Sequence, residues 1–170
     1  ILAVGRLSVQ KDFDTLVRAF AQLRKTHDAS LVILGDGEMR GQLEELVRGL
    51  HLEAYVTLYG FVDNPYKYMR SADLFVLSSI YEGLPNVLIE ALALGTNVIS
   101  TACRSGPAEI LRDGVYGQLV PVGDCDALSD AMVWAIENPL KASEMTRMAA
   151  DDIEKYTPEI VTRKLVNLFV

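Results

Sequence analysis

Two glutamates, eight positions apart, are the residues of this sequence most suited to do chemistry. Glu82 and Glu90 belong to the stretch "YEGLPNVLIEALALG", and every other residue from Val87 to Thr96 is apolar or small. An unpaired carboxylate in such surroundings is costly even after the protein relaxes around it. Glu90 therefore needs a partner. A buried Arg or Lys would provide one, in which case Glu82 would only cap a helix.

The residues before Glu90 predict a helix whose start can hold an anion. Pro85 suits the first helical position. The N–H groups of Asn86, Val87 and Leu88 would then be free donors at the positive end of the helix. Glu90 follows Asn86 by four residues and so shares its face. Hydroxyls of a ribose held at this helix start would satisfy Glu90, and Glu82 could bind hydroxyls of a second sugar.

The first loop of the chain, "GRLSVQK", adds two cations. Arg6 and Lys11 lie between an apolar run and a helical pattern, where Gly5 allows a tight turn. The loop lacks the G-x-G-x-x-G fingerprint of dinucleotide-binding proteins, which disfavours an NAD-dependent oxidoreductase. We interpret the two cations as anion ligands; a solvated lysine at a helix start is the alternative.

Two further loops follow apolar runs. In "GDGEMRG", Gly35 and Gly37 could leave backbone amides free near a ligand, and Asp36 could accept a hydrogen bond, although an ordinary turn explains the same residues. In "GFVDNPYKY", the backbone around Phe61 and Val62 could contact a nucleobase, although an ordinary loop is the simpler interpretation.

These loops require strands and helices to position them. The apolar runs that predict strands cover 1–4, 30–35, 55–60, 73–78, 97–101 and 117–122. The periodic stretches that predict helices cover 12–25, 38–50, 66–70, 85–94, 108–112, 126–137, 141–155 and a last one from about Pro158. Alternation of strands with helices predicts an α/β fold, a doubly wound Rossmann-like parallel sheet of about six strands. Ligands of such sheets bind beyond the carboxyl ends of the strands.

Composition limits the function classes. A length of 170 residues suits one domain over 1–170, and the net charge of −7 comes without a basic stripe, so nucleic acid is not an expected partner. No apolar run is long enough for a membrane span. Because the chain opens directly on a predicted strand, we expect it to be part of a longer protein.

Taken together, the motifs resemble a known family. "GRLxxxK", "GDG", "GFVDNPY", "SADLFVLSSxYEGLPNVLIEALALG" and "SGPxEILRDGxxGxLVPVGD" occur in order and cover essentially the whole chain. They resemble the C-terminal, donor-binding domain of retaining glycosyltransferases of family 4, or group 1. Such enzymes have the GT-B architecture, in which two Rossmann-like domains face each other across a cleft. Glu82 and Glu90 match the E-x7-E motif of that family.

The resemblance implies a role for each matching residue. Arg6 and Lys11 would bind the diphosphate of a nucleotide-sugar and stabilise the leaving nucleotide, and Glu82 would contact the donor sugar; these three are the candidate catalytic residues. Glu90 would bind the ribose. The other implied nucleotide contacts are Gly35, Asp36, Gly37, Phe61, Val62, Asn86, Val87 and Leu88. The other implied sugar contacts are Gly83, Leu84, Pro85 and Asn86.

The resemblance also implies the chemistry and the partners. The donor would be a nucleotide-sugar, with UDP favoured over GDP, and no cofactor or metal is expected because cations replace the metal and no Asp-x-Asp motif is present. Transfer would retain anomeric configuration. A glycan or lipid-linked acceptor would bind mainly to a second, N-terminal domain that this chain lacks. We expect a cytoplasmic protein whose full-length form is a candidate for association with the inner face of the cell membrane.

Two other functions stay open at this point. A nucleotide-sugar epimerase shares the GT-B layout, but its chemistry needs histidines and carboxylates in the cleft, and neither His27 nor His51 lies in a strand-end loop. A non-catalytic binding module would leave both glutamates with structural roles only.

Overall fold

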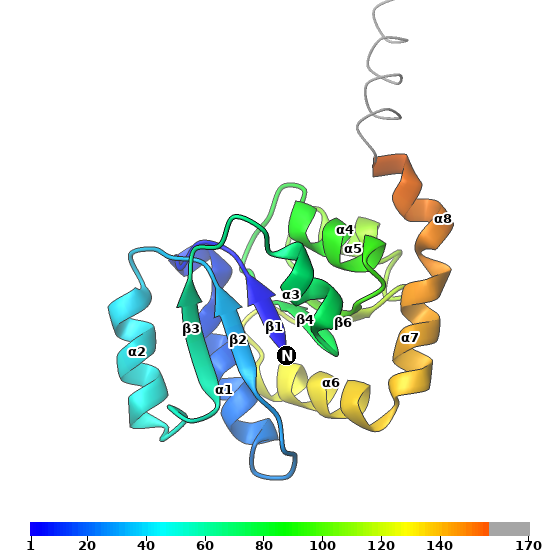
Figure 1. Cartoon of the computed structure of the whole chain (residues 1–170). Coiled ribbons are helices and arrows are strands. Elements are labelled where there is room, and N and C mark those ends of the chain that lie inside the picture. The colour runs from blue at the N-terminus through cyan, green and yellow to red at the C-terminus, as the bar shows by residue number, and fades with distance from the viewer. Residues whose placement is uncertain (157–170) are drawn as a thin grey trace, which may run out of the picture.

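The computed structural model describes residues 1–156, which form one parallel sheet covered by helices (Figure 1). The strands are β1 (Leu2–Val4), β2 (Leu31–Leu34), β3 (Val56–Gly60), β4 (Leu74–Leu77), β5 (Asn97–Thr101) and β6 (Gln118–Val120). All six predicted strands are confirmed, each at or within its predicted bounds. The strand order is β3-β2-β1-β4-β5-β6, which confirms the doubly wound Rossmann-like prediction.

The helices follow the strands as predicted, with one exception near the end. They are α1 (Phe13–Leu23), α2 (Arg40–Gly49), α3 (Tyr66–Ser71), α4 (Asn86–Ala93), α5 (Pro107–Ile110), α6 (Cys125–Glu137), α7 (Pro139–Met148) and α8 (Ala150–Ile153). The single helix predicted for 141–155 is wrong: it is divided between α7, α8 and a 3₁₀ turn over Glu154–Tyr156. The helix predicted from Pro158 lies outside the described residues.

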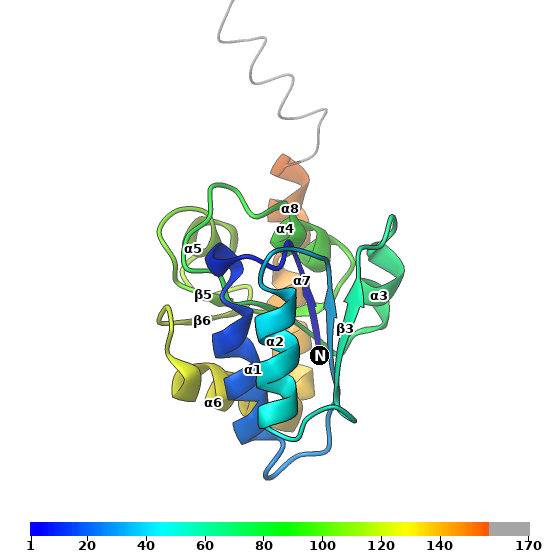
Figure 2. The ribbon, with the colours of Figure 1, turned by 90° about the vertical axis from the view of Figure 1, so that its left-hand side faces the viewer.

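Alternate residues of the central strands pack into two separate cores. In β4, Leu74 and Val76 face the core formed with α1, α2 and α6, whereas Phe75 and Leu77 face the core formed with α4 and α8. All four residues are buried. Figure 2 shows α2 and α3 on opposite sides of β3. Burial on both faces explains why β4 is continuously apolar in sequence.

The order of the strands places a switch point between β1 and β4. From β1 the chain adds β2 and β3 on one side, then returns to place β4, β5 and β6 on the other side. β1 and β4 are neighbours, with Leu2 paired to Phe75. The loops that leave these two strands, 5–11 and 78–85, therefore flank the crevice where doubly wound sheets bind ligands.

Candidate functional site

The predicted site residues gather at one edge of the sheet. In Figure 1 the carboxyl ends of β1, β2 and β3 point to the top, and the loops that follow them lie there. After β1 come Arg6 and Lys11; after β2, Gly35 to Gly37; after β3, Phe61 and Val62; after β4, Glu82 to Asn86. The topology thus brings together residues that are up to 80 positions apart in sequence, from Arg6 to Asn86.

An ion pair between Lys11 and Glu82 bridges the two loops of the switch point. Lys11 Nζ lies 2.6 Å from Glu82 Oε1, and the two side chains are only 16% and 8% exposed. A Cβ atom on Gly5 would lie 3.1 Å from Lys11 Cε, so the lysine chain crosses Gly5 closely to reach its partner. Lys11 has three N–H donors, and the pair uses one of them.

Buried serines, which sequence analysis missed, support this pair. The Ser79 hydroxyl donates to Glu82 Oε1 at 2.6 Å, and the Ser78 hydroxyl donates to the Lys11 carbonyl at 2.7 Å. Both serines are buried. The only sequence signal was a pair of small hydroxyl residues at the end of an apolar strand, which looked like an ordinary strand end.

Gln10 adds two further bonds between the same loops. The Ile80 N–H donates to the Gln10 carbonyl at 2.8 Å, and Gln10 Nε2 donates to the Tyr81 carbonyl at 2.9 Å. The loop after β4 is thereby held against the loop after β1 by backbone and side-chain bonds, independently of the ion pair.

The end of β5 and the loop that follows it contact the loop after β4 from the other side. The Thr101 hydroxyl donates to the Ser79 carbonyl at 2.6 Å. Gly106 has φ +84°, and a Cβ atom there would lie 2.6 Å from both the Gly83 carbonyl oxygen and Pro85 Cδ. Glycine is therefore required at position 106 for this close approach.

The start of α4 differs from prediction in two details. α4 begins at Asn86, and Pro85 occupies the capping position rather than the first helical one. The prediction that Leu88 offers a free N–H is wrong, because that group donates to the Pro85 carbonyl at 2.9 Å. Among residues 1–156, the N–H groups of Asn86 and Val87 have no recorded acceptor. The helix start therefore offers two donors to an anion rather than three.

Glu90 is half-buried on α4 and has no cation as partner within the described part of the chain. Burial raises the pKa of its carboxyl group, and hydrogen bonding to the Tyr66 hydroxyl at the start of α3 partly opposes that rise. The alternative in which a buried Arg or Lys neutralises Glu90 thus finds no support among residues 1–156. Its carboxylate is poorly solvated and can accept further hydrogen bonds.

Arg6 is the exposed cation of the site. Its guanidinium lies 3.2 Å from Glu38 Oε2, and the two side chains are 75% and 54% exposed. Exposed pairs of this kind contribute little stability. Arg6 can therefore leave Glu38 for a stronger anion such as a phosphate at little cost.

The prediction that Gly35 and Gly37 free their amides for a ligand is wrong. The Gly35 N–H donates to the Gly60 carbonyl at 2.8 Å, and the Gly37 N–H donates to Asp36 Oδ1 at 2.8 Å. A Cβ atom would lie 1.9 Å from the Gly5 carbonyl oxygen at position 35 and 2.4 Å from the Leu7 carbonyl oxygen at position 37. The two glycines let the loop after β2 touch the loop that carries Arg6 and Lys11.

Phe61 and Val62 lie between β3 and α3. The Phe61 side chain is 76% exposed, whereas Val62 is half-buried against the core. Phe61, at the carboxyl edge of the sheet, is therefore largely open to solvent, whereas Val62 packs inward.

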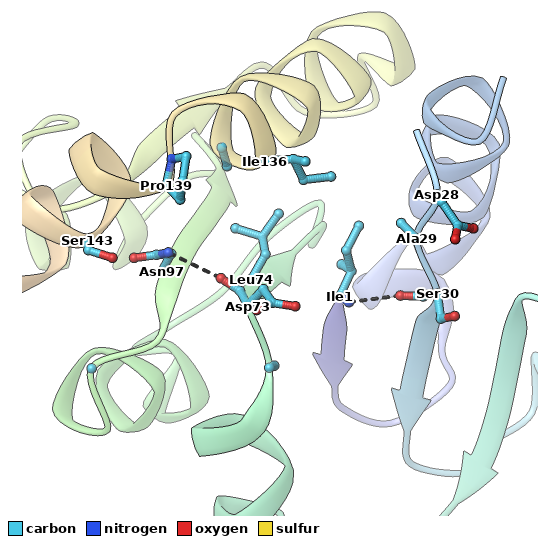
Figure 3. Close-up of a pocket in the computed structure, with 13 residues that line it drawn as sticks. Ile1, Asp28, Ala29, Ser30, Asp73, Leu74, Asn97, Ile136, Pro139 and Ser143 are labelled. Atoms are coloured by element: carbon cyan, nitrogen blue, oxygen red, sulfur yellow. Dashed lines mark hydrogen bonds between the residues drawn. The ribbon is translucent and has the colours of Figure 1, made fainter. Parts of the chain in front are cut away.

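A pocket at the opposite end of the sheet contains none of these residues. Its volume is about 480 Å³, and Figure 3 shows it beside Ile1, Ser30, Asp73 and Asn97 at the amino ends of the strands. The hydrogen bonds drawn there, from Ile1 N to the Ser30 carbonyl at 2.8 Å and from Asn97 Nδ2 to the Asp73 carbonyl at 3.2 Å, brace the sheet. We assign this pocket no chemistry.

No three His, Cys, Asp or Glu side chains within 1–156 are grouped to hold a metal ion. No helix in that range is long and apolar enough to cross a membrane.

The doubly wound parallel sheet, with charged residues at its switch point, defines a Rossmann-like α/β domain. Comparison with known proteins makes the assignment specific. The chain belongs to the glycosyl transferases group 1 family, whose model matches residues 1–152. This confirms the family to which the sequence motifs pointed.

Similar proteins support the assignment. An N-acetylgalactosaminyltransferase from Campylobacter jejuni that acts on a diphospho-undecaprenol-linked saccharide is 41% identical over 138 residues, 81% of this chain and 37% of that protein. A lipopolysaccharide core biosynthesis glycosyltransferase from Rhizobium meliloti is 32% identical over 169 residues, 99% of this chain and 48% of that protein. The chain thus spans less than half of each relative.

Among solved structures, a TarM variant from S. aureus in complex with fondaparinux, α-GlcNAc-glycerol and UDP superposes with a TM-score of 0.91. The two share 26% sequence identity over 99% of this chain and 35% of that one. The architecture predicted from sequence is therefore that of solved glycosyltransferases.

Proposed function

We propose that this chain binds the nucleotide-sugar donor of a glycosyltransferase and acts as the C-terminal domain of a longer GT-B enzyme. The observation that carries the proposal is the Lys11–Glu82 pair beside the start of α4, at the switch point of the sheet. A cation, a carboxylate and free helix N–H donors in one crevice suit a ligand that has both phosphates and hydroxyls.

The leaving nucleotide is the centre of the proposed chemistry. When the bond between the sugar and the diphosphate breaks, negative charge develops on the phosphate oxygens. Lys11, Arg6 and the N–H groups of Asn86 and Val87 are the groups that would stabilise that charge as it forms. Lys11 keeps two N–H donors for phosphate while it holds Glu82.

The two glutamates would recognise hydroxyls on either side of the diphosphate. Glu90 is half-buried, and burial raises the pKa of its carboxyl group, so a pair of ribose hydroxyls would replace the water that it lacks. Glu82 would accept from hydroxyls of the donor sugar. Backbone near Phe61 and Val62 would contact the base, as the exposure of Phe61 allows.

UDP is the nucleotide that we propose first. Its support is the structure of the TarM variant, which includes UDP and shares the fold of this chain at 26% identity. We further propose transfer of a hexosyl group with retention, without a metal, to a glycan or lipid-linked acceptor. The Campylobacter relative, whose name gives a lipid-linked acceptor, supports the acceptor class, and association with the inner membrane face follows from that acceptor.

Titration calorimetry of the chain with nucleotides tests the proposal. We expect UDP and UDP-sugars to bind, GDP and GDP-mannose to bind more weakly, and uridine to bind poorly because it lacks the diphosphate. If neither UDP, nor a UDP-sugar, nor GDP, nor GDP-mannose binds at millimolar concentration, the proposal is contradicted and a non-catalytic module is favoured.

A further inference from the structure

The Glu82 carboxylate is held by one of its two oxygens. Lys11 Nζ and the Ser79 hydroxyl both donate to Oε1, each at 2.6 Å. No donor within residues 1–156 is recorded for Oε2. The only buried side-chain nitrogen or oxygen without a partner in that range is Arg24 Nε, so Oε2 retains contact with solvent.

Hydrogen bonds from β5 and to the loop after β1 hold the backbone at Ser79 in place. Its side chain is fully buried. Its carbonyl accepts from the Thr101 hydroxyl at 2.6 Å, and the next residue, Ile80, donates its N–H to the Gln10 carbonyl at 2.8 Å. The Ser79 hydroxyl therefore has a defined position from which it can orient the carboxylate three residues later.

We propose that Ser79 is a positioning residue: with Lys11 it anchors Oε1 of Glu82, so that Oε2 is presented to a hydroxyl of the donor sugar. This inference rests on the proposed function, because it assigns the sugar contact to Glu82. Lys11 alone would hold the carboxylate loosely, because an ammonium group can donate to a carboxylate from many directions. A second donor on the same oxygen restricts the carboxylate to one orientation.

A positioning role for Ser79 affects binding of the sugar and not binding of the nucleotide. The Ser79 hydroxyl donates to Glu82, and within residues 1–156 no hydrogen bond joins Ser79 to Glu90 or Arg6. Loss of its hydroxyl should therefore weaken the extra binding that the sugar provides and leave the binding of UDP itself nearly unchanged. A purely structural role for Ser79 would affect UDP and UDP-sugar to the same extent.

The test is calorimetry of the chain and its Ser79→Ala variant with UDP, UDP-glucose and UDP-N-acetylglucosamine. We expect the Kd of the better UDP-sugar to rise about tenfold in Ser79→Ala, the effect of one hydrogen bond to a charged group, with less than about a twofold change for UDP. In the Glu82→Gln background, Ser79→Ala should have little further effect on the UDP-sugar.

Two further variants serve as a matched control and as a substitute if Ser79→Ala does not fold. Ser100→Ala is the matched control, because Ser100 is fully buried and its hydroxyl donates only to the Thr101 carbonyl, at 3.0 Å. It should leave the ratio of the UDP and UDP-sugar Kd values unchanged. If Ser79→Ala does not fold, Ser79→Cys keeps a side chain of similar size with only a weak donor and should lower the same ratio.

The outcomes distinguish the two claims. Failure of the unmodified chain to bind UDP would overturn the proposal that UDP is its nucleotide, together with the positioning role. UDP binding with no advantage for either UDP-sugar, or with the same advantage in Ser79→Ala as in the unmodified chain, would overturn the positioning role alone. A selective loss of the sugar advantage supports it.

Discussion

Lys11 Nζ lies 2.6 Å from Oε1 of Glu82, a residue 71 positions later in the sequence. Both side chains are largely buried, so removal of either charge leaves the other poorly solvated. We predict that Lys11→Met lowers the free energy of unfolding by about 3 kcal/mol, the lower end for a broken buried pair. Urea unfolding measures the change.

The double variant Lys11→Met/Glu82→Gln gives the matched comparison. It removes both charges, so it should recover most of the stability that Lys11→Met loses. Equal stability of Lys11→Met and the unmodified chain would show that Glu82 remains well solvated without Lys11, contrary to this prediction.

Substitution of Arg6, unlike that of Lys11, should affect nucleotide binding and not stability. Because it is 75% exposed in its pair with Glu38, Arg6→Gln should change the free energy of unfolding by less than about 0.5 kcal/mol. It should weaken UDP binding roughly tenfold through loss of a phosphate contact and leave uridine binding unchanged.

Arg18→Gln is the control for this charge change. Arg18 is half exposed on α1, paired with Asp14, and we place it outside the site. An equal loss of UDP affinity in Arg6→Gln and Arg18→Gln would mean that net charge alone attracts the nucleotide.

Glu90→Gln should weaken UDP binding and stabilise the chain. The amide cannot replace a charged acceptor for ribose hydroxyls, so we expect the Kd for UDP to rise about tenfold. Burial raises the pKa of Glu90, so the folded chain keeps this proton to higher pH than the unfolded chain. The resulting stability is fully present below the unfolded pKa and is lost as pH rises through the folded pKa.

Thermal unfolding as a function of pH measures this second effect. The variant, which stays neutral, should gain in Tm over the unmodified chain as pH rises from about 4 to about 7. A constant difference in Tm over that range would contradict the unfavourable burial of the charged form.

Gly37→Ala should destabilise the chain through the backbone. The added Cβ would lie 2.4 Å from the Leu7 carbonyl oxygen, and we expect a loss of about 2 kcal/mol or more from the forced shift. Gly41→Ala, in α2, meets nothing within 4 Å and should stabilise the chain by up to about 1 kcal/mol. Equal effects of the two substitutions on urea unfolding would contradict the close approach of the two loops.

The fold was predictable because its signals are local. Each strand contains a short apolar run, which is unbroken in β4 because helices cover both faces of the sheet there, and the residues that end each run place the loops at one edge. The break between α7 and α8 at Ala149 was not predictable, because no proline or glycine lies near it.

The location of the site in the fold was predictable from the sequence. The contacts among its residues were only partly predictable. Sequence spacing put Glu90 one turn behind Asn86, but it could not show that Lys11 pairs with Glu82, because that contact depends on two loops from distant strands. In the same way, Gly35 and Gly37 looked like ligand-binding glycines, and only the position of the neighbouring loop reveals that they serve close backbone packing.

We propose that nucleotide binds at the carboxyl edge of the sheet, over the switch point between β1 and β4. NMR titration of the ¹⁵N-labelled chain with UDP tests this placement most directly. We predict that the amide signals of 5–11, 60–62 and 83–90 shift, while those of Ser30, Asp73 and Asn97, which line the pocket in Figure 3, do not. Shifts confined to that pocket, or no shifts at millimolar UDP, would contradict it.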